Sequence, residues 1–309
     1  MNILTTLVRS LGAAAIVLGL LLVPLPAAAQ SSTFGPGDIF VSTEDGQIHW
    51  RRPDGTLNRF LVGTAAGKPE GLRLDAASNL YVARWCVSAV ATSTCAVGNT
   101  VEKFNQHGMS LGTVGSDYNC NPHAVAFDAL GNAYVGQADC SGNILKLQLG
   151  RAPTAYAAAA ETRGTFWIDM AADGCTIFYT SIGPNVKRFD TCGNLQQPDF
   201  NLAPLPGGVG HDLRVLPDGG VLVTSAGVIA RLDATGALVQ TYTAPGATRY
   251  WSGLDLVGDG TFWVADYNTS DVYRFDLATG DAVASFNTGT ATQTVISVAV
   301  VKAGAVVCP

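Results

Sequence analysis

The sequence predicts an all-β fold, a six-bladed β-propeller with four antiparallel strands in each blade. A short apolar strand motif recurs six times, roughly every 40 to 50 residues, which is a period typical of propeller blades. Asp-Gly and Gly-Asn turns accompany the motif, and such pairs supply the positive φ values that hairpins need. No segment shows the apolar spacing of an amphipathic helix.

Each copy of the motif has two or three apolar residues and ends before a small or polar one. The copies begin at Ile39, Leu80, Ala133, Ile177, Val221 and Phe262. An apolar-X-apolar segment and a turn precede most copies, as in Leu72-Arg73-Leu74. A third strand follows, and then a more polar fourth strand such as Ala237 to Thr243. We therefore interpret each copy as the second of four strands in a blade.

The two ends of the chain complete one blade between them. The N-terminal part enters at a second strand, Gly37 to Thr43, with no first strand before it. The C-terminal part supplies an extra first strand, Thr294 to Val300. Pairing these strands predicts a closed ring, which removes the exposed edges of an open array.

A secretory signal peptide is predicted at Met1 to Ala29. Arg9 precedes an apolar run from Leu11 to Val23, and Ala27-Ala28-Ala29 gives the small residues of a cleavage site. The apolar run is shorter than the roughly 20 residues of a membrane span. Residues 30–309 are then a single propeller domain, secreted or periplasmic.

Composition excludes several classes of protein. The chain has 309 residues, a net charge of −6, and only 14% charged residues against 48% hydrophobic ones. This balance argues against a charge-rich helical bundle, against disorder and against a nucleic-acid partner.

The cysteines are expected to form three local disulfides. The blade layout places the members of each pair at one end of neighbouring strands, within bonding reach, and the pairs are Cys86 with Cys95, Cys120 with Cys140, and Cys175 with Cys192. Cys308 is left over. Paired cysteines are typical of an oxidising compartment.

Candidate site residues appear when the six first strands are aligned at their starts. The level nearest the mouth of the central channel holds Glu70, His123, Phe166, His211, Ser252 and Val295. Two imidazoles and one carboxylate suit an acid/base pair or a metal site, so Glu70, His123 and His211 are the catalytic or metal-binding candidates. Alternatively, these side chains only hydrogen-bond neighbouring loops or water.

A second set of residues lies further along the first strands. The X positions of apolar-X-apolar hold Arg73, Asp169, Arg214 and Asp255. Charges flanked by apolar residues on an inner strand need partners, so we expect a channel charge network. A ligand-binding role for the same charges is the alternative.

Segments such as Pro122-His123-Ala124-Val125-Ala126-Phe127-Asp128-Ala129-Leu130-Gly131-Asn132 resemble the repeat of NHL-type six-bladed propellers. The wider superfamily includes gluconolactonase/regucalcin-like enzymes and virginiamycin B lyase. In that resemblance Glu70 corresponds to the metal-binding Glu of the lactonases. His123, Phe166 and His211 stand where those enzymes have Asn and Asp. The lyase has a Glu-X-His motif after its corresponding His, and no such motif follows His211 here.

Two functions follow as hypotheses. The first is a monomeric, secreted scaffold that binds a protein, peptide or glycan on a loop face and needs no cofactor. The alternative is a lactonase-like hydrolase or lyase with a divalent metal ion at the channel mouth. Trp85, Trp167, Trp251 and Tyr250 lie near strand ends, where they either pack between blades or stack on a ligand.

Overall fold

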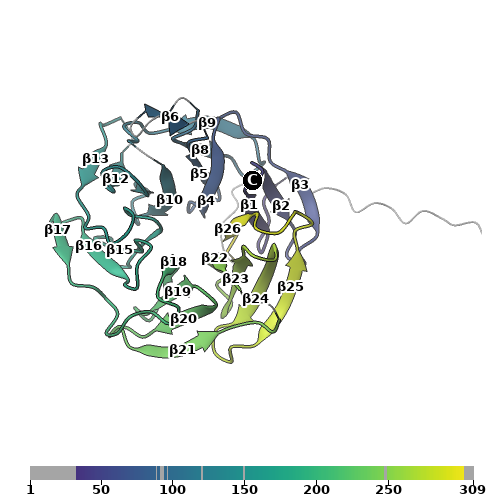
Figure 1. Cartoon of the computed structure of the whole chain (residues 1–309). Coiled ribbons are helices and arrows are strands. Elements are labelled where there is room, and N and C mark those ends of the chain that lie inside the picture. The colour runs from purple at the N-terminus through teal and green to yellow at the C-terminus, as the bar shows by residue number, and fades with distance from the viewer. Residues whose placement is uncertain are drawn as a thin grey trace, which may run out of the picture. The chain divides into compact units, whose positions relative to one another are not determined.

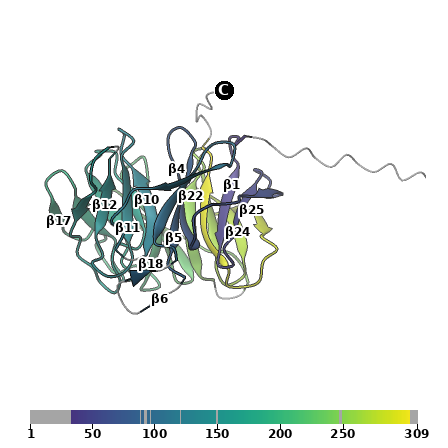
Figure 2. The ribbon, with the colours of Figure 1, turned by 90° about the horizontal axis from the view of Figure 1, so that it is seen from above.

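The predicted propeller is confirmed. The computed structural model describes residues 33–302 except 88, 91–93, 96, 120, 149 and 247–248. These residues form six four-stranded antiparallel sheets arranged as a ring around a central axis (Figure 1), which we call the channel. Seen from the side, the strands run between the two faces of the ring (Figure 2).

Each blade has four strands in order from the channel outward. Blade 1 is β26 (Val295–Val300), β1 (Ile39–Thr43), β2 (Ile48–Arg51) and β3 (Leu57–Phe60). Blade 2 is β4 (Lys68–Leu74), β5 (Leu80–Trp85), β8 (Thr100–Phe104) and β9 (Ser110–Val114). Blade 3 is β10 (Pro122–Phe127), β11 (Ala133–Gln137), β12 (Ile144–Leu147) and β13 (Thr154–Tyr156).

The other three blades follow the same order. Blade 4 is β14 (Ile168–Met170), β15 (Thr176–Tyr179), β16 (Lys187–Asp190) and β17 (Leu195–Gln197). Blade 5 is β18 (Gly210–Val215), β19 (Val221–Ser225), β20 (Val228–Leu232) and β21 (Leu238–Tyr242). Blade 6 is β22 (Trp251–Leu256), β23 (Thr261–Asp266), β24 (Asp271–Asp276) and β25 (Ala282–Asn287).

The ring closes as the sequence predicts. β26 pairs antiparallel with β1, with Ile39 opposite Val300 and Ser42 opposite Ser297. The last strand of the chain thus becomes the innermost strand of the first blade. Every first and second strand is therefore paired on both sides or turned to the channel. Among the described strand residues, the exposed ones lie on the outermost strand of each blade.

The core lies between the blades, where apolar side chains of neighbouring sheets interdigitate. Trp50 and Trp251 are fully buried, and Trp50 Nε1 donates a hydrogen bond of 2.8 Å to Asp38 Oδ2. Trp251 thus belongs to the packing of blade 6 and not to a ligand surface. This arrangement, in which both faces of each sheet are covered, explains the low charged fraction of the sequence.

Two of the predicted disulfides are present, Cys86–Cys95 and Cys175–Cys192. Cys140 is disulfide-bonded, while Cys120, its predicted partner, lies outside the described residues. Cys308 and the predicted signal peptide, Met1 to Ala29, also lie outside them. The bonds indicate an oxidising compartment.

The sequence pattern did not predict one small hairpin. The connection between β5 and β8 contains a small hairpin, β6 (Ala89–Val90) and β7 (Thr94–Cys95), which the Cys86–Cys95 bond ties to the end of β5. The described residues contain no helix with the length and apolar character of a membrane span.

Candidate functional site

The candidate site is positioned by irregularities that recur near the start of the first strands. The pairing register shifts between Pro69 and Leu72 in β4, and at the equivalent places in β10, β18 and β22. Such bulges insert a residue and re-aim its side chain. The shifted segments hold Glu70, His123, His211 and Ser252.

Hydroxyl groups of neighbouring blades hold these bulges in place. They come from the small or polar residue that ends the second-strand motif. Ser42 Oγ donates to the carbonyl of Glu70 at 2.6 Å, and Thr180 Oγ1 donates to the carbonyl of His211 at 2.5 Å. The motif that marks a second strand in the sequence therefore also fixes the backbone of the site.

Close approach of adjacent first strands adds a second constraint. A Cβ at Gly71 would overlap the carbonyl oxygen of His123. Only glycine lets β4 approach β10 this closely. As a result, Glu70 and His123, which come from different blades, lie side by side.

A cavity of about 480 Å³ lies at the end of the channel where the first strands begin, and we call it the first-strand cavity. It contains five of the six residues that alignment placed at one level, namely Glu70, His123, Phe166, His211 and Ser252. The sixth residue at that level, Val295, does not line the cavity, and its neighbour Ile296 does. The rim adds Lys68, Trp85, Arg163, Ile182, Tyr250 and Tyr267.

Glu70 is a buried carboxyl that shares its lysine partner with another acid. Lys68 Nζ lies 3.1 Å from Glu70 Oε1 and also pairs with Glu44. Burial raises the pKa of Glu70 to about 7, against the opposing effect of Lys68. Burial disfavours the charge of Lys68, but the two carboxylates outweigh it and raise the pKa of Lys68. Glu70 therefore changes protonation near neutral pH.

The two imidazoles stay neutral at that pH. Burial, together with the charge of Arg163, holds the pKa of His123 well below its usual range. Burial lowers the pKa of His211 to about 4. His123 Nε2 lies 3.9 Å from Glu70 Oε2. Within the described structure, His123 Nδ1 and His211 Nε2 have no hydrogen-bond partner.

Aromatic rings surround these groups. His123 packs on Phe166, with ring centroids 3.7 Å apart, and on Trp167 at 4.6 Å. His211 contacts Tyr250 at 4.6 Å. Tyr250 is 37% exposed, so this ring presents a face to solvent beside a buried imidazole.

The rim also contains strained backbone. Ile182 and Gln293 both line the cavity and have φ values of 53° and 62°. A β-branched residue such as isoleucine rarely adopts the left-handed region, and strain of this kind clusters at ligand-binding sites. Neither residue carries a repeat signal that would identify it in the sequence.

The predicted channel charges lie in direct contact below the cavity. Arg73 Nη2 lies 2.5 Å from Asp169 Oδ1, and Arg214 Nε lies 3.0 Å from Asp255 Oδ1. Arg73 Nη1 lies 3.6 Å from the same Asp255 oxygen. The second oxygens of Asp169 and Asp255 accept backbone N–H groups of Val215 and Val300. The four charges thus link blades 1, 2, 4, 5 and 6.

Asp212 joins this network, although the sequence pattern did not predict it. Its Oδ1 lies 2.6 Å from Arg214 Nη1, and its Oδ2 accepts the N–H of Leu254 in the next blade. Burial raises the pKa of Asp212 to about 6, against the opposing charge of Arg214. The signal for Asp212 is its place in the bulge of β18, two residues before Arg214, which only the register reveals.

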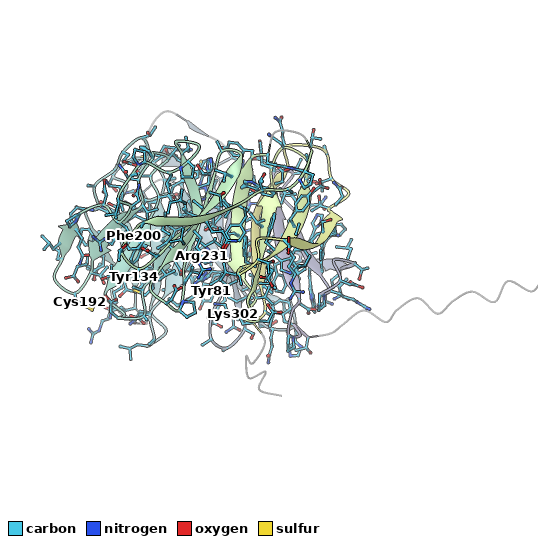
Figure 3. The ribbon with its side chains drawn as sticks, turned by 90° about the horizontal axis from the view of Figure 1, so that it is seen from below. Tyr81, Tyr134, Cys192, Phe200, Arg231 and Lys302 are labelled. Atoms are coloured by element: carbon cyan, nitrogen blue, oxygen red, sulfur yellow. A yellow bond between two sulfur atoms is a disulfide. The ribbon has the colours of Figure 1, made fainter. Side chains whose placement is uncertain are left out.

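The network borders a second cavity, which is distinct from the first-strand cavity. This second cavity is lined by Arg73, Asp255 and Lys302, among others, and Lys302 is labelled in Figure 3.

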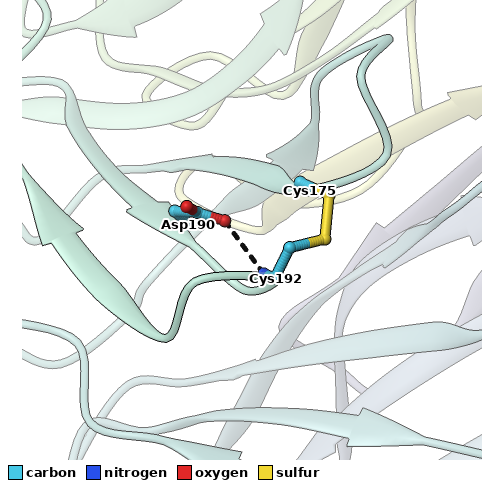
Figure 4. A group of neighbouring side chains, drawn as sticks. All are labelled: Cys175, Asp190 and Cys192. Carbon is cyan, nitrogen blue, oxygen red and sulfur yellow. Dashed lines mark hydrogen bonds between the residues drawn. A yellow bond between two sulfur atoms is a disulfide. The ribbon is translucent and has the colours of Figure 1, made fainter.

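A group of three side chains with metal-ligand chemistry lies elsewhere in the structure. Among the described residues, only Cys175, Asp190 and Cys192 bring three donor atoms within 4.8 Å of one another (Figure 4). Both sulfurs are joined in a disulfide, so neither is the thiolate that a metal ion needs. Glu70, His123 and His211 share the first-strand cavity but are not gathered to this distance in the described part of the chain.

Comparisons with solved structures show the same fold in other proteins. A chain of the nidogen/laminin complex has a TM-score of 0.69 at 14% identity and covers 86% of this chain and 99% of its own. A protein of unknown function from Bacteroides caccae has a TM-score of 0.64 at 12% identity, covering 85% of this chain and 98% of its own.

Virginiamycin B lyase from Staphylococcus aureus has a TM-score of 0.53 at 13% identity, covering 72% of this chain and 70% of its own. No family model and no curated protein sequence matches the chain. At these identities the likeness is one of fold.

Proposed function

We propose that this protein is an exported propeller that binds a ligand in the first-strand cavity, through a protein, peptide or glycan group. The observation that carries the proposal is that two buried imidazoles, each with a ring nitrogen that has no hydrogen-bond partner in the described structure, line the same cavity. Buried polar groups are nearly always paired, so unpaired ones in a pocket point to a missing partner.

The shape and lining of the cavity support the same function. A volume of about 480 Å³ is within the range of ligand pockets. Aromatic walls with a few convergent polar groups are typical of such pockets. The nidogen/laminin complex and virginiamycin B lyase share the fold with this chain, so the scaffold supports both protein recognition and lyase chemistry. The disulfides and the predicted signal segment Met1 to Ala29 support export.

A matched pair of histidine variants tests the proposal. Glycan and peptide libraries are screened with the purified protein, and each ligand found is titrated by calorimetry. His211→Phe keeps the ring against Tyr250 but removes its nitrogens, so binding is expected to weaken at least tenfold. His49 is equally buried but lies on β2, outside the cavity lining, so His49→Phe is expected to leave binding unchanged. Equal affinity in wild type and His211→Phe would overturn the assignment.

An acid/base enzyme is the second candidate, and the Glu70–His123 pair favours it. Near pH 7 a partly protonated carboxyl lies 3.9 Å from a neutral imidazole, so the cavity holds two side chains of the types that serve in general acid/base catalysis. Neutral imidazoles and a carboxylate also suit a divalent metal in donor type. The donor atoms of Glu70, His123 and His211 are not all within 4.8 Å of one another in the described structure, so these side chains would have to move closer to hold such an ion, which would polarise a substrate oxygen.

Elemental analysis and a lactone-hydrolysis screen test whether the protein is such an enzyme. One equivalent of metal that is lost in both His123→Ala and His211→Ala would support the metal site. A metal content that is unchanged in both variants would remove it, and calorimetry on the same preparations would still report ligand binding.

A further inference from the structure

The charged groups at the rim of the first-strand cavity already have partners. Lys68 pairs with Glu44 and Glu70. Arg163 Nε donates to Asp139 Oδ1 at 2.9 Å, in a two-point contact that also engages its Nη2. An anionic ligand would therefore have to take Lys68 or Arg163 from its carboxylate, and a charge that loses water without gaining a partner is costly.

The floor of the cavity presents groups that suit hydroxyls. A neutral imidazole has one donor and one acceptor nitrogen, and the two forms interconvert. A hydroxyl both donates and accepts, so it can pair with His123 and His211 in either form. It can likewise pair with Glu70 whether that carboxyl is protonated or ionised.

The aromatic surface that remains free is the tyrosine pair at the rim. Lys68 Nζ and Arg163 Cζ already lie over the Trp85 ring, at 5.4 and 4.9 Å from its centroid. By contrast, Tyr250 is 37% exposed, and Tyr267 lies beside it with ring centroids 5.7 Å apart. These two rings offer an apolar platform with hydroxyl groups at its edge.

Resting on the proposed function, we infer that the group bound in the first-strand cavity is an uncharged ring that carries hydroxyls, namely a neutral sugar. Its hydroxyls pair with the floor imidazoles and Glu70, and its C–H face packs on Tyr250 and Tyr267. Uronic acids are disfavoured, because they bring a negative charge for which the described rim has no free cation: Lys68 and Arg163 are both paired.

Matched sugars that differ only in charge test this inference. The probes are methyl glycosides of gluco-, galacto- and manno-pyranose, each with its uronate and its 2-amino form, titrated into the full mature protein by calorimetry. We expect at least one neutral sugar to bind, and its uronate to bind at least tenfold more weakly. We expect Tyr250→Ala to weaken binding tenfold or more and Tyr250→Phe to weaken it less.

Phe60→Ala is the control, since Phe60 is an exposed aromatic residue on the outer strand β3 and lies outside the cavity lining. It should bind like wild type. If Tyr250→Ala fails to fold by circular dichroism, Tyr267→Leu replaces it.

The outcomes separate this inference from the proposed function. Tighter binding of uronates or amino sugars, or no sugar binding up to about 10 mM, would overturn the inference of a neutral sugar. A peptide that binds and is lost in Tyr250→Ala would then uphold the proposed site with a different ligand. Sugar binding that neither Tyr250→Ala nor His211→Phe weakens would overturn the site and the inference together.

Discussion

Replacing Arg214 by leucine is expected to lower the free energy of unfolding by about 3–5 kcal/mol, the usual cost of removing one partner from a buried ion pair. Arg214 is 2% exposed and contacts both Asp212 and Asp255. Without the guanidinium, two carboxylates remain buried next to each other, and each must either carry an unpaired charge or take up a proton.

The pH dependence of the Arg214→Leu variant gives a second signature. Arg214 lowers the pKa of both Asp212 and Asp255, so its loss makes both carboxyls easier to protonate in the folded state. The folded variant then binds protons more tightly than the unfolded chain. Its deficit in stability should be larger at pH 8 than at pH 5.

A surface ion pair provides the matched control. Arg231 Nη2 lies 3.1 Å from Asp218 Oδ2, but the side chains are 24% and 57% exposed. Exposed pairs contribute at most about 1 kcal/mol, so Arg231→Leu should change the urea midpoint only slightly. Equal losses in the two variants, measured by urea titration at pH 5 and 8, would show that the channel network does not stabilise the ring.

Replacing Glu70 by glutamine is expected to stabilise the protein by about 3 kcal/mol at pH 8 and to leave its stability unchanged near pH 4. Burial raises the pKa of Glu70 from 4.5 to about 7. Since the folded protein holds this proton more tightly than the unfolded chain, stability falls as pH rises from 4.5 through 7. Glutamine has a similar shape and does not titrate, so it removes that loss.

Glu102 is a control, because its replacement by glutamine is expected to change the stability in the opposite direction. It is also fully buried, but Arg84 Nε donates to its Oε2 at 2.7 Å and Ser110 also donates to it. Burial alone would raise its pKa, and these partners outweigh burial and lower it. Its stabilisation is present above pH 4.5 and is lost as pH falls through the folded pKa. Glu102→Gln should therefore destabilise the protein at pH 8.

Thermal unfolding of both variants across pH 4 to 9 makes the comparison. A Glu70→Gln effect that does not depend on pH would contradict the raised pKa. If the expected gain is observed, Glu70 is a residue retained at a cost in stability, as binding and catalytic residues commonly are.

The sequence by itself determined the architecture. Strand alternation and turn residues are local signals, so the motif copies at Ile39, Leu80 and their equivalents predicted the blades. The unpaired strands at the two ends of the chain predicted the closure, which β26 and β1 confirm. The Cys86–Cys95 and Cys175–Cys192 bonds join residues of one blade, so their pairing followed from the same layout.

Only the tertiary structure decided how the site is assembled. Alignment placed Glu70, His123 and His211 at one level, but their directions depend on bulges and on contacts between blades, such as that of Gly71 with His123. Asp212, Arg163 and Ile182 lie outside the repeat pattern. The bulges recur from blade to blade, but side-chain contacts such as that of Arg163 with Asp139 arise once, where two blades meet, and leave no period to detect. The repeated motifs therefore specify the scaffold, whereas the candidate site depends on residues that differ from blade to blade.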